Sequence, residues 1–268
     1  METLPFNRFH CESFLRGAEA EGWITDRREI DFLLAAYPEG CLVSLDNDRP
    51  AGFITAIRYA KSAWIGNLLV LPEYRCRGIG RGLMQKVLQS LDRSGCETVW
   101  LTASADGAHL YGTLGFMQID TVQRWKGSCE APFRGGRLAY TAVVAAIDCL
   151  GWGDCRRAIF ESLPVNGSCY SAHDGFLVHS PCGDGQQIGP WGAVSRDAAA
   201  VLLDAALGSE GSGGKIFLDV PEKNCAAEEL LSSRGFSVSG STQLMYRGRT
   251  PEYRADHVYS LASMGSYG

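Results

Sequence analysis

The sequence predicts an α/β (α+β) fold built from two similar domains in tandem, and three features of the chain support this. A length of 268 residues exceeds one typical domain and suits two of moderate size. Short apolar segments with strand character alternate with amphipathic segments of helical period along the chain. The order of these segments in the first half returns in the second half, which is the pattern of an internal duplication.

The first half opens with two predicted helices, followed by three strands and two helix–strand units. The second helix begins at a capping residue, Thr25 or Asp26, and ends at Pro38 to Gly40. A polar turn at 46–50 joins the first two strands. We expect helices at 11–22, 26–36, 79–94 and 105–114, and strands at 41–45, 51–59, 64–71, 98–102 and 116–125.

A polar, glycine-containing stretch at 127–136 is the best linker candidate, so the predicted domains are 1–126 and 137–268. Asp174-Gly175 between apolar runs predicts a hairpin turn that pairs His173 with Phe176. In this half we expect strands at 138–147, 187–194, 215–220 and 236–247, helices at 148–163, 195–207 and 222–234, and a hairpin at 169–179.

The spacing of matching features supports the duplication. In the first half, 32 positions separate Leu83, in a predicted helix, from Gly115, where a Gly-Phe pair opens the last strand. In the second half, 33 positions separate Leu202 from Gly235, which begins an equivalent Gly-Phe pair. Two unrelated α/β segments with similar spacing are the alternative, because this order of elements is common.

Composition and charge exclude several classes of function. The net charge is −5 and no dense block of lysine and arginine occurs, so no nucleic-acid partner is expected. The amino terminus lacks a basic region followed by a long apolar core, and Asp148 interrupts the longest apolar stretch. We therefore expect no membrane partner and a cytoplasmic location. The ten cysteines are scattered and are expected to be reduced thiols.

Cys169, His173, His179 and Cys182 form the densest group of metal-ligand residue types. In the predicted hairpin, Cys169 and His173 lie on one face and His179 on the other, because side chains alternate along a strand. Ligands on opposite faces cannot converge on one tetrahedral ion without distortion. The sequence therefore predicts no metal site.

The most specific feature of the sequence lies between Leu68 and Leu91. An apolar run ends at Pro72, and Arg-Cys-Arg-Gly-Ile-Gly-Arg-Gly-Leu at 75–83 leads into an amphipathic helix. A strand that passes through glycines into a helix presents free N–H groups and the positive end of a helix dipole to an anion. The segment matches neither the nucleotide-triphosphate loop G-x-x-x-x-G-K-[ST] nor the dinucleotide loop G-x-G-x-x-G.

Val70, Pro72, Arg75, Gly78 and Gly80 match V-x-P-x-x-[RQ]-x-x-G-x-[GA], so the segment resembles the acyl-CoA-binding motif of the GNAT acetyltransferase superfamily. The resemblance implies a mixed, mostly antiparallel sheet flanked by helices, with acetyl-CoA as co-substrate. It also implies that the Val70 N–H meets the acetyl oxygen. The expected cofactor-binding residues are Leu69, Val70, Arg75, Cys76, Arg77, Gly78, Ile79, Gly80, Arg81, Gly82 and Ser104.

Tyr111 is the expected catalytic residue. With Ala108, Gly115 and Phe116 it matches the A-x-x-Y-x-x-x-G-F pattern of the same family, in which this tyrosine commonly protonates the departing thiolate. A phenol of pKa about 10 is a sensible partner for a thiol of pKa about 8.5. A packed, purely structural tyrosine is the alternative. No general base is identifiable, because Asn67, beside the expected thioester, carries an amide.

The second half lacks these features. Residues 189–195 stand where the first half has its glycine-rich turn, and Leu231 occupies the place of Tyr111. The whole chain resembles a tandem two-copy GNAT subgroup whose second domain carries a GPW-A strand and a D-x-x-x-x-G-x-x-R helix. The matching residues here are Gly189, Pro190, Trp191, Ala193, Asp148, Gly153 and Arg156. We therefore expect a degenerate second domain that shapes or covers the acceptor site.

Together these resemblances predict an acetyl-CoA-dependent N-acetyltransferase that moves an acetyl group to a primary amine by direct transfer in a ternary complex. The acceptor is a small-molecule or peptide amine that fold-level analogy does not identify. A non-catalytic acyl-CoA-binding sensor or interaction module is the alternative. Tyr111 disfavours it, because such a module needs no acid for a thiolate. Formation of a homo-oligomer stays open.

Overall fold

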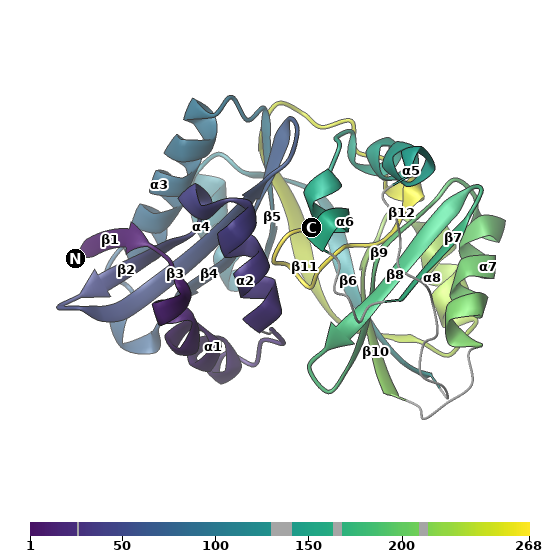
Figure 1. Ribbon diagram of the computed structural model, residues 1–268, viewed down its shortest axis with the longest axis horizontal. Helices are drawn as coiled ribbons and strands as arrows, with labels where there is room; N and C mark the ends of the chain where they lie inside the picture. Colours follow the sequence, from purple (N-terminus) through teal and green to yellow (C-terminus); the bar gives the residue numbers. More distant parts are fainter. Residues whose placement is uncertain (26, 130–140, 163–167, 209–213) are drawn as a thin grey trace.

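The computed structural model describes residues 1–25, 27–129, 141–162, 168–208 and 214–268, which form two α/β halves joined by one sheet (Figure 1). The sheet order is β1-β2-β3-β4-β5-β11-β6-β10-β9-β8-β7, and β12 pairs with β9. The strands are β1 (Glu2–Pro5), β2 (Leu42–Asp46), β3 (Arg49–Arg58), β4 (Ser62–Val70), β5 (Thr98–Ala103), β6 (Met117–Cys129), β7 (Ser168–Ala172), β8 (Gly175–Cys182), β9 (Gly185–Ala193), β10 (Gly214–Pro221), β11 (Ser237–Gly248) and β12 (Val258–Ser260).

Helices cover both faces of the first half. Phe53 and Ile57 of β3 belong to the core cluster that contains residues of α1 (Cys11–Ala20) and α2 (Arg27–Ala36). Ile54 and Ala56 of the same strand belong to the cluster formed with α3 (Ile79–Arg93). The alternation of side chains along β3 therefore places α1 and α2 on one face of the sheet and α3 on the other. A shorter helix, α4 (Ala105–Thr113), follows β5 on the α3 face.

The second half has the same layered plan. Its helices are α5 (Ala142–Trp152), α6 (Arg157–Ser162), α7 (Arg196–Leu207) and α8 (Cys225–Ser232). Leucines of α7 and α8 pack with Ile216 and Leu218 of β10 in a separate core cluster. Most strand pairs in the sheet are antiparallel, and the exceptions are β4–β5 in the first half and β9–β10 in the second.

The two halves exchange their last strands. In the first half, β5 pairs with β11, which comes from the end of the second half. In the second half, β10 pairs with β6, which comes from the end of the first. Strands β6 and β11 also pair with each other at the centre of the sheet (Figure 1). Each half therefore completes its sheet with a strand of the other.

The internal duplication is confirmed by matching hydrogen bonds as well as by strand order. The Tyr111 carbonyl at the end of α4 accepts N–H groups of residues 114 and 116, at 2.9 and 3.1 Å. The Leu231 carbonyl at the end of α8 accepts those of residues 234 and 236, at 3.0 and 3.1 Å. Tyr111 and Leu231 therefore occupy equivalent places in the two halves.

The strand predicted at 138–147 is wrong over its described part, 141–147. Residues from Ala142 onward form α5, where the Thr141 side chain accepts the Val144 N–H as a helix cap. The apolar, partly β-branched run indicated a strand, but a cap at one end and left-handed Gly153 at the other favour a helix. The single helix predicted at 148–163 is also wrong, because α5 ends at Trp152 and α6 begins only at Arg157.

The hairpin predicted at 169–179 exists, but its predicted register is wrong. The turn consists of His173 and Asp174, and Cys169 pairs with Val178 rather than Ser180. His179 pairs with Ser168. Because the register differs by an even number of residues, Cys169 and His179 remain on opposite faces.

Four predicted features fall partly outside the described residues, among them the strand at 138–147, at 138–140, and the helix at 148–163, at 163. The expected linker at 127–136 overlaps β6, which runs to Cys129, and residues 130–136 lie outside the described ranges. The proposed cap at Asp26 also lies outside them, and α2 begins at Arg27. Two short strands that the sequence did not predict, β1 and β12, complete the sheet.

Candidate functional site

The parallel strands β4 and β5 separate towards their carboxyl ends. Their ladder joins Ser62–Trp64 to Thr98–Trp100 and stops there, whereas β4 continues to Val70 and β5 to Ala103. Asn67, in the part of β4 beyond the ladder, has a positive φ of 54°. This opening exposes backbone hydrogen-bonding groups of two strands to a ligand that lies between them.

The turn from β4 to α3 ends in an uncapped helix start. Gly78 is the residue before the helix, adopts the left-handed conformation (φ 77°, ψ 5°) and makes no side-chain capping hydrogen bond. Exposed Cys76 is also left-handed, with a φ of 60°. The first N–H groups of a helix have no partner within the helix, so residues 79–81 present donors at its positive end. This arrangement suits an anion such as a phosphate.

Gly80 lies where α3, β4 and α4 meet. A Cβ atom at Gly80 would lie 3.6 Å from Cγ2 of Val70, 3.8 Å from Cδ2 of Leu110 and 3.9 Å from Cδ2 of Leu68. These are ordinary contact distances, so an alanine fits. A longer side chain would fill the space between the end of β4 and α4. At Gly82, by contrast, no atom lies within 4 Å of an added Cβ.

The two arginines of the turn and Arg81, in the first turn of α3, make different hydrogen bonds. Arg75, 47% exposed, donates to the carbonyl at the end of β4 at 3.1 Å and pairs with Glu21 after α1. Arg81 donates to the Thr113 hydroxyl on α4 at 2.9 Å, which ties the start of α3 to that helix. Arg77 donates to a backbone carbonyl within the turn at 2.9 Å. Arg75 therefore braces the turn against α1, while Arg77 and Arg81 lie near the helix start.

Tyr111 lies on α4 and packs against the same hydrophobic cluster as Val70 at the end of β4. Its ring centroid is 6.0 Å from that of Phe116, and a Cβ added at Gly107 would lie 3.1 Å from its Cε2. Burial raises the pKa of Tyr111 to about 12. The phenol therefore keeps its proton at neutral pH. Ser104 caps α4, where its Oγ accepts the Gly107 N–H at 3.2 Å.

The Asn67 amide is held within the fold. Its Nδ2 donates to Thr55 Oγ1 at 3.0 Å, and the Thr55 hydroxyl donates to the Gly66 carbonyl at 3.3 Å. Its Oδ1 accepts the Ser266 hydroxyl at 3.4 Å. Asn67 is 9% exposed. These contacts give the amide a role in fixing the irregular part of β4.

Sequence reasoning missed the segment 261–268, which leaves β12 and runs against β4 of the first half. Trp64 Nε1 donates to the Gly265 carbonyl at 3.0 Å. A Cβ at Gly66 would lie only 2.4 Å from the Ser266 carbonyl oxygen, so the strand needs glycine where this segment crosses it. A glycine inside a predicted strand was the one signal in the sequence for this close approach.

The equivalent opening of the second half is filled by its own chain. Strand β12 pairs with β9, and its Val258 lies opposite Gly192. Leu261, the residue after β12, donates its N–H to the Asp219 carbonyl of β10 at 2.8 Å. A Cβ added at Gly189 of β9 would lie 1.8 Å from the Leu261 carbonyl oxygen. The segment 258–261 therefore lies between the two strands that diverge.

The second half also lacks the turn that precedes α3. Eight residues, 71–78, connect β4 to α3, whereas two, 194–195, connect β9 to α7. The cap of α7 is the Ser195 side chain, which accepts the Ala198 N–H. With Leu231 in the place of Tyr111, the second half has neither the glycine-rich turn nor the phenol of the first.

The residues of the predicted D-x-x-x-x-G-x-x-R pattern form a structural pair. Arg156 donates to both carboxylate oxygens of Asp148, at 2.6 and 3.1 Å, and both side chains are buried. The guanidinium also lies 4.3 Å from the ring centroid of Trp152 and donates to the Gly268 backbone oxygen at 3.0 Å. Gly153 supplies the left-handed end of α5. The pair anchors segment 261–268 to α5.

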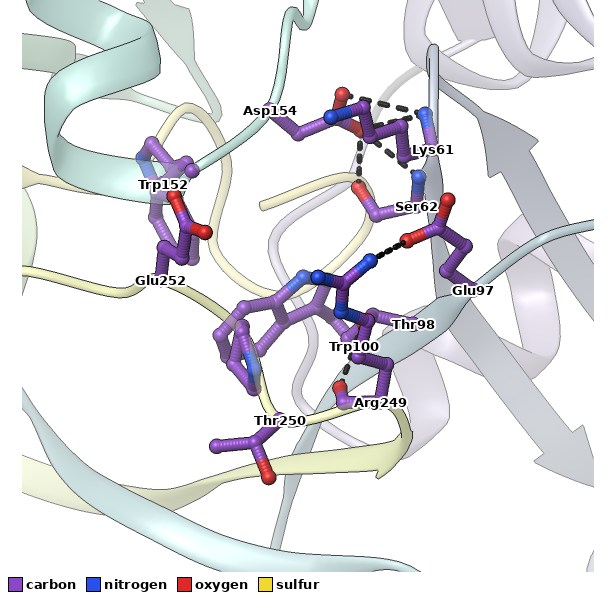
Figure 2. Close-up of a pocket in the computed structure, with 12 residues that line it drawn as sticks. Lys61, Ser62, Glu97, Thr98, Trp100, Trp152, Asp154, Arg249, Thr250 and Glu252 are labelled. Atoms are coloured by element: carbon purple, nitrogen blue, oxygen red, sulfur yellow. Dashed lines mark hydrogen bonds and ion pairs between the residues drawn. The ribbon is translucent and has the colours of Figure 1, made fainter.

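A polar cavity of about 60 Å³ lies where the two halves meet at the amino ends of β4 and β5 (Figure 2). Asp154 from the second half accepts the Ser62 N–H at 2.8 Å and the Ser62 hydroxyl at 2.7 Å, and it also accepts the Lys61 N–H. Arg249 and Glu97, which both line the cavity, form an ion pair at 2.9 Å (Figure 2). These polar groups satisfy one another at the end of β4 remote from Val70. The cavity is therefore a junction between the halves.

Neither a metal-ligand cluster nor a membrane-spanning helix is found in the ranges that the structure describes. No three histidine, cysteine, aspartate or glutamate side chains there are placed to hold one metal ion. No helix in those ranges is both long enough and apolar enough to cross a membrane.

Comparison with known proteins supports one family over most of the chain. Residues 7–116 match the model of the acetyltransferase (GNAT) family, and residues 146–260 match an acetyltransferase (GNAT) domain. A crystal structure of a presumed acetyltransferase from Pyrococcus horikoshii has 24% identity and a TM-score of 0.84, over 98% of this chain and 94% of that one. A GCN5-related N-acetyltransferase from Sphaerobacter thermophilus has 12% identity and a TM-score of 0.63, over 97% and 98%. These structures share the fold.

Two curated relatives are enzymes of acyl transfer. The [ribosomal protein bS18]-alanine N-acetyltransferase of Escherichia coli (strain K12) is 32% identical over 29% of this chain, which spans 54% of that protein. The holothin acyltransferase of Pseudoalteromonas sp. (strain SANK 73390) is 23% identical over 92% of this chain and 88% of that protein. With both halves matched by GNAT models, the chain belongs to the GNAT acetyltransferase family and carries two such domains in tandem.

Proposed function

We propose that this protein is an acetyl-CoA-dependent N-acetyltransferase with one working site, in the first half, that passes the acetyl group directly to a primary amine. The observation that carries the proposal is the meeting at Gly80 of three features. These are the open end of the β4–β5 pair, the uncapped start of α3, and α4 with Tyr111. The second half has a filled opening and no glycine-rich turn.

The residues around this opening fit an acyl-CoA. The free N–H groups at the start of α3 suit its pyrophosphate, with Arg77 and Arg81 close by to add positive charge. The β4 backbone at Leu69 and Val70 is open towards β5 and can bind the acyl and pantetheine groups. Arg75 and Ser104 support this site from the turn and from the cap of α4.

Acetyl-CoA supplies a thioester that an uncharged amine can attack, and the chain must supply orientation and protons. The Tyr111 phenol, protonated at neutral pH, can donate a hydrogen bond to the sulfur as its charge develops. The Val70 N–H can donate to the carbonyl oxygen of the thioester. Direct transfer needs the amine and the thioester together in the opening, so binding both substrates precedes the chemical step.

The domain division has a functional consequence. We propose residues 1–126 as the catalytic domain, 127–136 as the linker and 137–268 as the degenerate partner. Strand β11 of the partner pairs with β5 of the catalytic domain, and segment 261–268 of the partner crosses β4. The likeness to the holothin acyltransferase over most of the chain supports a small-molecule amine as the acceptor, and the likeness to the ribosomal-protein enzyme supports a peptide amine.

The direct test is release of free thiol from acetyl-CoA in the presence of a panel of amines and amino-terminal peptides. We expect one or more acceptors to release thiol faster than the no-amine control, with an equal amount of N-acetylated product by mass spectrometry. Tight acetyl-CoA binding without thiol release for any acceptor would favour the non-catalytic sensor. Failure to bind acetyl-CoA would contradict both.

A further inference from the structure

Segment 261–268 lies on one face of the opening between β4 and β5, and the turn at 71–78 lies on the other. The side chain of Trp64, which donates to Gly265, belongs to the core cluster of α1 and α2. Gly66 lies two residues further along β4 and therefore faces the same side, where Ser266 crosses it. The start of α3 lies on the opposite face. If acyl-CoA enters from the α3 face, the acceptor approaches from the face of α1, α2 and segment 261–268.

Contacts between the two halves define this surface. The rings of Tyr267 and Phe32 of α2 are 5.5 Å apart and nearly perpendicular. Met264 Sδ lies 3.9 Å from Cys182 Sγ, at the end of β8. A Cβ added at the next residue, Gly183, would lie 2.8 Å from Cγ2 of Ile24, in the connection between α1 and α2. We call Phe32, Ile24, Cys182, Met264 and Tyr267 the acceptor-side surface; all five are partly exposed.

The segment that forms this surface is fixed in place. The Ser263 hydroxyl accepts the N–H groups of residues 266 and 267, at 2.9 and 2.8 Å. The Tyr59 hydroxyl donates to the Tyr267 carbonyl, and the Met264 carbonyl accepts Arg124 at 3.3 Å. Ser263 and Ser266 are buried. A segment held by this many hydrogen bonds has a fixed backbone, and its partly exposed side chains are therefore preorganised.

The charges of the surrounding elements disfavour a polycation. Glu21, after α1, pairs with Arg75, and Asp31 of α2 pairs with Arg8 at 3.3 Å and with Arg27 at 3.4 Å. Asp184, in the turn after β8, pairs with Lys215 at 2.6 Å. A polyamine gains affinity mainly from carboxylates that have no other cation to neutralise. Thioether, thiol and aromatic groups instead favour a flat, polarizable ring.

From these observations we infer that the acceptor-side surface selects a planar aromatic monoamine over a polyamine, with Met264 and Tyr267 of the second half as specificity-determining residues. The inference rests on the proposed function. It assigns the degenerate half a defined part in acceptor recognition, because it supplies one wall of a site whose acyl-CoA residues all lie in the first half.

The test combines binding and turnover with tyramine and spermidine as probes. In protein with ¹³C-methyl methionine and saturating CoA, tyramine should shift the Met264 signal at lower concentration than spermidine does, while the Met117 signal, from an exposed residue on β6, stays in place. In thiol-release assays, Met264→Ala should raise the KM for tyramine about tenfold without changing the Kd for acetyl-CoA. Met117→Ala is the matched control and should change neither.

A variant that gains activity towards the other amine shows that a change in KM does not come from misfolding. Met264→Glu places a carboxylate on the surface and should lower the KM for spermidine while raising that for tyramine. The inference is overturned if spermidine shifts the Met264 signal as readily as tyramine, or if tyramine leaves it in place. Failure of acetyl-CoA binding would instead overturn the proposed function, so the two outcomes are distinguishable.

Discussion

Tyr111 combines a family position with an environment that changes its chemistry. Burial against Phe116 and Gly107 raises its pKa to about 12, above the value near 10 of a free phenol. A complete proton transfer to a thiolate whose thiol has a pKa of about 8.5 is then uphill. In the proposed reaction the phenol therefore acts mainly as a hydrogen-bond donor to the sulfur, and the proton that the amine loses balances the one that the thiol product gains.

The variant Tyr111→Phe removes this donor without removing the packed ring. We expect kcat to fall about a hundredfold, with the acetyl-CoA Kd within a factor of two of the wild type. Because the pKa is raised, the phenol stays protonated below pH 12, so Tyr111 should cause no loss of kcat up to pH 10. A wild-type kcat that falls with an apparent pKa near 9, and does not fall so in the phenylalanine variant, would contradict this account.

At the scale of elements, the first half was predictable because its signals are local. The β4–turn–α3 and β5–α4–β6 units followed from glycines, caps and hydrophobic period within about twenty residues. Residues 142–147 were wrongly assigned to a strand, because an apolar run is ambiguous between strand and helix and the cap at Thr141 favours the helix. The contact of Gly66 with Ser266 could not be predicted, since 200 positions separate the two residues. The local sequence pattern of β6 and β11 likewise does not indicate which sheet edge each strand joins.

A substitution at Gly189 tests whether segment 258–261 fills the opening between β9 and β10. The φ of Gly189 is 156°, and a Cβ would collide with the Leu261 carbonyl oxygen at 1.8 Å. Gly189→Ala should therefore lower the free energy of unfolding by about 3 kcal/mol, measured by urea denaturation. Gly240→Ala on β11, where an added Cβ has no atom within 4 Å, is the control and should change little. Equal stability of the two variants would mean that segment 258–261 does not lie between β9 and β10.

At the scale of the whole molecule, the halves form one structure. Strands β6 and β11 cross over to the sheet of the other half, and Asp154 ties the second half to the start of β4. Backbone pairing of described strands therefore joins the two halves. Through this pairing we expect the second half to affect the proposed site.

A substitution at Asp154 tests whether the two halves unfold as one unit. The buried carboxylate of Asp154 accepts three backbone N–H groups, those of Lys61, Ser62 and Cys155, and the Ser62 hydroxyl, and an alanine would remove this shared acceptor. We expect Asp154→Ala to lower the free energy of unfolding by about 3 kcal/mol in a single cooperative transition. Asp184→Ala, which removes an exposed carboxylate, serves as the control and should leave the urea midpoint unchanged. Two separate transitions in the Asp154 variant would show that the halves unfold independently.

The central claim is that one acyl-CoA binds at the opening beside Gly80 and none binds in the second half. Calorimetric titration of acetyl-CoA tests it with wild type, Gly80→Ala, Gly80→Leu and the control Gly240→Leu. We expect one site per chain in the wild type, comparable binding in Gly80→Ala, whose Cβ fits at 3.6 Å or more, and retained binding in the control. Gly80→Leu should be folded and should bind at least a hundredfold more weakly. Unchanged affinity in Gly80→Leu, or two sites per chain, would contradict the account.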